Sequence, residues 1–165
     1  MELGQQSAAP VCNRPAPRMA EGRRKTGRDP TRQTDPHLVL MADDDEDYFV
    51  IVRHALRASG TAAKLVHLCD GQALLDYLAR REENLPALIL LDIRMPTMDG
   101  RETLNRLKAD PCLCDIPVVM LTGGREDRAK PPSSLGAEAF FNKPPAFDQW
   151  VELMKLLADQ WLPEG

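Results

Sequence analysis

Short apolar runs alternate with amphipathic stretches from His37 to the end of the chain. Five of these runs are expected to be buried strands: 37–42, 64–69, 87–91, 116–121 and 137–142. Apolar residues at three- and four-residue spacing predict helices over 47–59, 70–81, 99–109 and 147–162. Gly60 follows the first helix directly and is expected to cap it.

The order of these elements predicts the fold class. Strands and helices alternate along the chain, and the run 87–91 is continuously apolar, as in a strand that is covered on both faces. We therefore expect an α/β fold with a doubly wound, five-stranded parallel sheet. In such a sheet the functional residues gather at the carboxyl ends of the strands.

The segment between the fourth and fifth strands departs from the regular pattern. A helix is expected there, but Arg125 to Leu135 contains the pair Pro131-Pro132. A proline in a helix interior removes a backbone donor and clashes with the preceding turn, which costs roughly 3 kcal/mol. We predict a short or broken fourth helix that ends near Ala129.

Residues 1–36 differ in composition from the rest of the chain. They hold five prolines and three glycines but few large apolar side chains, and their net charge is +3. Such a segment cannot bury enough apolar surface to offset its ordering entropy. We expect a disordered N-terminal tail over 1–36 and one folded domain over 37–162. Two alternatives stay open: the arginines contact an acidic partner, or Met19 is the true start.

The composition narrows the class of function. Residues 37–165 carry a net charge of −7, which disfavours nucleic-acid binding. No apolar run approaches the ~20 residues that span a bilayer, and the N-terminus lacks the pattern of a secretory signal, so we expect a cytoplasmic protein without a membrane segment. Of the four cysteines, only Cys112 and Cys114 are close in sequence, with no histidine nearby, so free thiols are expected.

Polar residues follow four of the predicted strands where each one ends. The run 43–47 consists of five acidic residues, Asp92 ends an apolar run, and Thr122 and Lys143 follow the last two strands. Clustered carboxylates suit Mg²⁺, which prefers oxygen ligands and retains several waters. An aspartate beside such a metal can attack a phosphoryl group, and a lysine and a hydroxyl can stabilise the charge on its oxygens.

Four motifs in this order resemble the receiver domain of response regulators. They are the acidic pair after the first strand, Leu-Leu-Asp-Ile-Arg-Met-Pro-Thr-Met-Asp-Gly at 90–100, Leu-Thr-Gly at 121–123 and Asn-Lys-Pro at 142–144. The resemblance covers about residues 37–162 and implies a flavodoxin-like receiver fold. Four separated motifs that agree with the strand pattern are far more specific than any one of them alone.

The resemblance implies a metal site. Asp92 would be the phosphate acceptor and a metal ligand, Asp44 would bind Mg²⁺ directly, and Asp43 would bind it through water. Counting back from the end of the first helix selects this pair rather than Asp45. The backbone carbonyl of Arg94 would be a further ligand. The remaining acids of 43–47 are expected to be a solvated helix start that favours the helix dipole.

The resemblance also implies the groups that bind the phosphoryl oxygens. Thr122 would donate a hydrogen bond to one oxygen, and Lys143 would pair with the phosphate. Phe140 would occupy the position of the family's switch aromatic, with ordinary core packing as the alternative. The bond before Pro144 would be cis, as is common in the family.

The expected function is a phosphorylation-dependent signalling switch, not an enzyme. A sensor histidine kinase or a phosphotransfer protein would donate the phosphoryl group to Asp92, and the output would be contact with a downstream protein, because no DNA-binding domain follows the last helix. The run 90–96 and the last helix look similar to small regulators that pair with bacterial phytochromes. Those regulators often form homodimers, and the last helix offers a surface for this.

Two other classes of function share features with this sequence. A phosphatase of the haloacid-dehalogenase type also uses a metal-bound aspartate, but its Asp-x-Asp-x-Thr/Val motif lacks the Thr or Val here, where 43–47 is Asp-Asp-Asp-Glu-Asp. A degenerate receiver would bind its partner without phosphorylation. The intact acidic pair, acceptor, threonine and lysine argue against it, whereas Pro131-Pro132 keeps it open.

Overall fold

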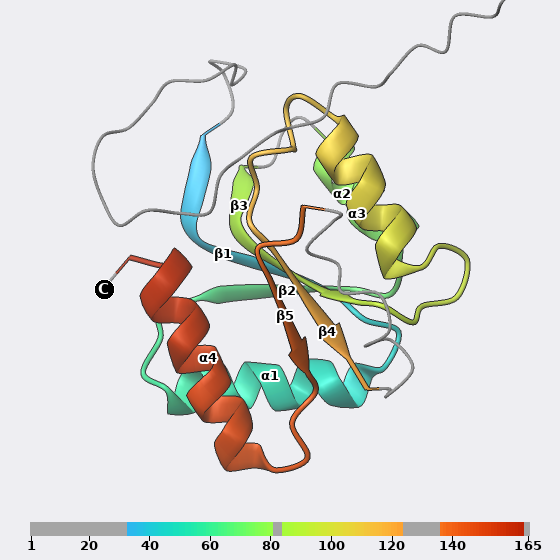
Figure 1. Ribbon diagram of the computed structural model, residues 1–165. Coiled ribbons are helices and arrows are strands. Elements are labelled where there is room, and N and C mark those ends of the chain that lie inside the picture. The colour runs from blue at the N-terminus through green and yellow to red at the C-terminus, as the bar shows by residue number, and fades with distance from the viewer. Residues whose placement is uncertain (1–32, 81–83, 124–135, 164–165) are drawn as a thin grey trace, which may run out of the picture.

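The computed structural model describes residues 33–80, 84–123 and 136–163 of the chain (Figure 1). Five parallel strands form one sheet in the order β2-β1-β3-β4-β5. The strands are β1 (Thr34–Ala42), β2 (Lys64–Leu68), β3 (Leu85–Asp92), β4 (Val118–Thr122) and β5 (Ala139–Asn142). The helices in these residues are α1 (Glu46–Ala58), α2 (Gly71–Ala79), α3 (Gly100–Ala109) and α4 (Phe147–Trp161).

The helices cover both faces of the sheet, so the core has two layers. Helices α1 and α4 lie on one face, and α2 and α3 lie on the other (Figure 1). Side chains of the central strands alternate between these layers: Leu40 and Ile89 face α2 and α3, whereas Met41 and Leu90 face α1 and α4. Every residue of β3 is buried. The predicted α/β fold with a five-stranded parallel sheet is therefore confirmed.

Aspartates begin three of the helices. Asp45, Asp70 and Asp99 each accept a hydrogen bond from a backbone N–H of the first turn of α1, α2 and α3. Gly60 follows α1 with φ +78° and donates its N–H to the carbonyl of Arg57, so the predicted glycine cap is confirmed.

Strand β1 begins before the expected boundary of the tail. Thr34 pairs with Leu85 and Asp35 with Pro86, and the carbonyl of Gln33 accepts a hydrogen bond from Leu85 N. The register then shifts before Val39. Thr34 and Asp35 thus belong to the sheet by backbone pairing, although their polar sequence gave no sign of a strand. Residues 1–32, the rest of the predicted tail, lie outside the described residues.

Two other expectations concern the region after β4. The predicted short or broken fourth helix falls on 124–135 and lies outside the described residues, so the label α4 denotes the last helix. The bond before Pro144 is trans, since the described residues hold no cis peptide, and the expected cis bond is corrected. In the part of the chain that the structure describes, no helix combines the length and apolar character of a membrane-spanning segment.

Candidate functional site

Parallel pairing brings the predicted site residues to one edge of the sheet. Asp43 directly follows β1, Asp92 is the last residue of β3, Thr122 is the last residue of β4, and Lys143 directly follows β5. Strands β1, β3, β4 and β5 are consecutive neighbours in the sheet. The carboxyl ends of these strands therefore form one site, as the doubly wound topology requires.

Three carboxylates form an acidic cluster in this site. One oxygen from each of Asp43, Asp44 and Asp92 lies within 4.8 Å of the others. Asp43 and Asp92 are buried, at 0% and 4% exposure, whereas Asp44 is exposed. Two carboxylates of the cluster are therefore shielded from solvent, and only that of Asp44 is exposed to it.

Lys143 lies between the two buried carboxylates. Its Nζ is 2.7 Å from Oδ2 of Asp43 and 3.2 Å from Oδ1 of Asp92, and its side chain is only 6% exposed. The backbone fixes its position as well, because Lys143 N donates a 2.7 Å hydrogen bond to the carbonyl of Thr122. One ammonium thus forms ion pairs with two carboxylates that follow or end neighbouring strands.

Burial changes the acidity of all three groups. The pKa of Asp92 is raised to about 6, chiefly by desolvation and also by the negative charges of Asp43 and Asp44, against the opposing effect of Lys143. Desolvation also raises the pKa of Asp43, although Lys143 and the N–H of Asp45 counteract it. For Lys143, desolvation lowers the pKa, but the hydrogen bonds and charges of Asp43 and Asp92 outweigh it and raise the pKa overall.

The charges and lone pairs of the cluster fit a divalent cation. Three carboxylates face one ammonium, which leaves an excess of negative charge at the site. Oδ2 of Asp43 is buried and already contacts one cation, Nζ of Lys143, at 2.7 Å. A single ammonium cannot neutralise three ionised carboxylates, so a further cation would stabilise the cluster. An all-oxygen donor set of this kind suits Mg²⁺ or Mn²⁺.

The start of α3 packs against the backbone at Asp92 and Ile93. Gly100 N donates a 2.9 Å hydrogen bond to the carbonyl of Ile93, and a Cβ at Gly100 would collide with the carbonyl oxygen of Asp92. Only glycine lets the helix approach the acceptor's backbone this closely. Within the same loop, Thr97 has φ +67°, a conformation that a β-branched residue adopts at a cost.

The other predicted residues lie around this cluster. Thr122 is 1% exposed at the end of β4, and Arg94 lies in the loop two residues after Asp92 with an exposed side chain. Phe140 is half-buried on β5 and packs against the core layer beneath α2 and α3. Asp45 accepts the N–H of Asp47 at the start of α1, which agrees with the expected helix start. The metal role of the Arg94 carbonyl stays a prediction.

Two contacts at the site were not foreseen from the sequence. The ring of Tyr48, in the first turn of α1, lies 3.9 Å from Nζ of Lys143. Nε2 of His67, on β2, is 2.8 Å from the carbonyl oxygen of Asp43 and can donate a hydrogen bond to it. An aromatic residue that follows a cluster of acids gives no signal in the sequence that its ring turns inward. The contact of His67 could have been predicted, because β2 pairs with the end of β1.

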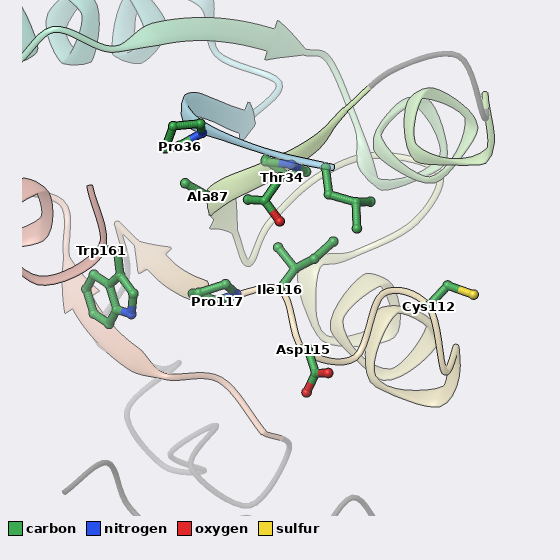
Figure 2. A pocket seen from close by; sticks show the side chains of 10 residues that line it. Thr34, Pro36, Ala87, Cys112, Asp115, Ile116, Pro117 and Trp161 are labelled. Atoms are coloured by element: carbon green, nitrogen blue, oxygen red, sulfur yellow. The ribbon is translucent and has the colours of Figure 1, made fainter. Parts of the chain in front are cut away.

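A separate hollow lies at the opposite ends of the same strands. Its volume is about 240 Å³, and its lining includes Thr34, Ala87, Asp115, Pro117 and Trp161 (Figure 2). The lining residues come from the beginnings of β1 and β3, from the segment before β4 and from the end of α4, far along the strands from Asp92. The hollow therefore has no part in the chemistry of the acidic cluster.

The sequence is similar to a known protein family and to curated proteins. The sequence model of the response regulator receiver domain matches residues 39–155. Among curated proteins, the probable methanogenesis regulatory protein FilR2 of Methanothrix harundinacea is 31% identical over 132 residues, 78% of this chain and 85% of FilR2. Response regulator Rcp1 of Synechocystis is 37% identical over 91 residues, which cover 53% of this chain and 62% of Rcp1.

Solved structures give the same picture. The phosphorylated cyanobacterial phytochrome response regulator RcpA superposes with a TM-score of 0.69 and 28% identity, covering 76% of this chain and 93% of RcpA. The Mn²⁺-bound form of Rcp1 gives 0.68 and 29%, covering 79% of this chain and 97% of that one. RPA3017, from red light signalling in R. palustris, gives 0.68 and 27%, covering 78% and 99%.

Proposed function

We propose that this chain, which belongs to the response regulator receiver domain family, is a phosphorylation-dependent signalling switch whose acceptor is Asp92. As a member of this family it is a phosphoacceptor rather than a conventional enzyme. Receiver domains work with histidine kinases, and the donor here is the phosphohistidine of a sensor kinase or of a phosphotransfer protein. The observation that carries the proposal is the contact of Lys143 with both Asp43 and Asp92 beneath an open acidic cluster.

The transfer is a displacement at phosphorus. A carboxylate oxygen of Asp92 attacks the phosphorus atom, the new P–O bond forms as the P–N bond to the donor's imidazole breaks, and the imidazole leaves and takes up a proton. Asp92 must be ionised to attack, and its pKa of about 6 leaves it mostly ionised at neutral pH. The buried ammonium of Lys143 and the hydroxyl of Thr122 bind the phosphoryl oxygens and stabilise their charge.

Mg²⁺ is the proposed cofactor. Asp44 and Asp92 would hold it directly, Asp43 would hold it through water, and the carbonyl of Arg94 would complete the protein's share of the ligands. When bound, the metal supplies positive charge that offsets the charge of the phosphoryl oxygens. The excess of carboxylate charge over the single ammonium and the all-oxygen donor set support this assignment.

The partners follow from the same proposal. RcpA is a phytochrome response regulator and RPA3017 acts in red light signalling, which favours a bacteriophytochrome histidine kinase as the donor. A cytoplasmic location is part of the proposal, since the protein must meet this donor. The output is contact with a downstream protein, for which the acidic body of the chain is better suited than for nucleic acid. A homodimer through α4 is part of the proposal.

Labelling with acetyl phosphate tests this function. Intact-mass spectrometry of the protein with acetyl phosphate and Mg²⁺ should show addition of one phosphoryl group, and EDTA should abolish it. Asp92→Asn should remain unlabelled, whereas Asp45→Asn should label like the wild type, because Asp45 caps α1 and asparagine caps equally well. Absence of labelling in a protein that still binds Mg²⁺ would favour a phosphorylation-independent binding module.

A further inference from the structure

Tyr48 gives Lys143 a third contact, which the phosphotransfer chemistry above does not use. Nζ lies 3.9 Å from the centroid of the Tyr48 ring, within the range of a cation–π interaction. The lysine side chain is 6% exposed, so water weakens this attraction little. The ammonium is therefore held by two carboxylates and by one aromatic ring.

The same ring connects the site to the last helix. The centroids of Tyr48 and Trp150 are 5.9 Å apart with an interplanar angle of 47°, an ordinary tilted aromatic pair. Trp150 lies on the inner face of α4 and is 2% exposed. Contacts thus run without interruption from Asp92 through Lys143 and Tyr48 to the core of α4.

We propose that Tyr48 is a positioning residue that sets the place of the Lys143 ammonium and transmits its displacement to Trp150 on α4. The proposal rests on phosphorylation of Asp92. A phosphoryl group there brings new anionic oxygens, which attract the ammonium away from its present place between Asp43 and Asp92. Because protein interiors are close-packed, a ring that loses its cation must shift with its neighbours.

This role is more than the filling of space. A purely structural Tyr48 would contribute to the α1–α4 core whether or not its ring faces a cation, and an apolar side chain of similar size would replace it. A positioning Tyr48 needs the π face but not the hydroxyl. The two roles therefore differ in how they respond to phenylalanine as compared with leucine or methionine.

The fluorescence of Trp150 reports the predicted displacement. The chain has two tryptophans, so Trp161→Phe leaves Trp150 as the single emitter. Beryllium fluoride with Mg²⁺ serves as the probe, since it mimics a phosphoryl group on a carboxylate, and fluorine NMR measures its binding independently of tryptophan. Within this background, Tyr48→Phe keeps the ring, whereas Tyr48→Leu and Tyr48→Met remove it. Tyr77→Leu is the matched control, because Tyr77 packs in the other core layer.

The expected result is a beryllium-fluoride-dependent change of Trp150 emission in the parent, in Tyr48→Phe and in Tyr77→Leu. In whichever of the two ringless variants folds, the change should be lost, and binding of the probe should weaken about fivefold. Weaker binding of the probe in the ringless variants, with Tyr48→Phe at the parent value, supports the positioning of Lys143. A Trp150 response that persists in a ringless variant contradicts transmission to α4.

A ringless variant that binds the probe normally and keeps the full Trp150 response would overturn the role of Tyr48 while leaving the proposed function intact. If the parent itself shows no bound beryllium fluoride by NMR, both the proposed function and the role of Tyr48 are contradicted. The two failures are therefore distinguishable.

Discussion

Lys143 and Asp43 form a buried ion pair that links the end of β5 to the end of β1. Nζ and Oδ2 are 2.7 Å apart, and the two side chains are 6% and 1% exposed. The strands that carry them are separated in the sheet by β3 and β4, so the pair bridges the site over Asp92. The pair itself is neutral, so the carboxylates of Asp44 and Asp92 remain in excess, and this connects folding stability to the binding of a cation.

Replacement of Lys143 should therefore destabilise the metal-free protein and strengthen its response to Mg²⁺. In Lys143→Met, two buried carboxylates lose their counter-ion, and the loss should be on the order of 3 kcal/mol in EDTA. Mg²⁺ should then raise the melting temperature more than it does in the wild type, because no ammonium repels it. Lys155→Met, at an exposed position on α4, is the control and should change neither quantity. Equal Mg²⁺ shifts in both variants would contradict the account.

Stability should depend on pH through Asp92. Its folded pKa of about 6 is above the ordinary value of 3.8, so between these values the folded state binds more protons than the unfolded state. Stability contributed by this group therefore falls as pH rises from about 4 to 6. Asp92→Asn should accordingly be more stable than the wild type in EDTA at pH 7.5, by about 2–3 kcal/mol, and this advantage should vanish near pH 4. Urea unfolding at several pH values measures it; an advantage that does not depend on pH would refute the assignment.

Thr97 should limit the stability of the loop after Asp92. A β-branched residue at φ +67° is strained, and glycine or asparagine tolerates this conformation better. We expect Thr97→Gly and Thr97→Asn to raise the free energy of unfolding by about 1 kcal/mol, and Thr97→Ala to raise it less. Urea unfolding measures this free energy, which should be highest with glycine or asparagine at position 97, lower with alanine and lowest with threonine. No gain in any variant would show that this conformation is not strained in solution.

Asp44 and Asp45 should differ sharply in metal binding, although they are neighbours in the sequence. Asp44 belongs to the cluster with Asp43 and Asp92, whereas Asp45 accepts the N–H of Asp47 and begins α1. Asp44→Asn should weaken Mg²⁺ binding at least about tenfold, and Asp45→Asn should leave it within about twofold, since asparagine is an equal N-cap. Calorimetric titration compares them. Similar losses in both variants would mean that the acids act as a diffuse charge rather than as defined ligands.

The sequence predicted the sheet and the place of the cluster, because both depend on local patterns. Continuous apolar runs marked the central strands, and parallel pairing then brought Asp43, Asp92 and Lys143 together without further information. The start of β1 was missed, since Thr34 and Asp35 join the sheet by backbone pairing with β3 and not by hydrophobicity.

The contacts of Tyr48 could not be predicted for a different reason. Whether its ring turns towards solvent or towards Lys143 depends on how α1 packs against α4, and that packing joins residues about a hundred positions apart. The helix pattern alone is compatible with either orientation.

Whether Asp92 itself accepts the phosphoryl group can be measured directly. The wild-type protein is phosphorylated with acetyl phosphate and Mg²⁺, treated with borohydride, which reduces an acyl phosphate to the alcohol, and sequenced by peptide mass spectrometry. We predict homoserine at position 92, in an amount that matches the phosphoryl content. Stoichiometric phosphorylation with an unmodified Asp92, or with the reduced residue at Asp43 or Asp44, would contradict it.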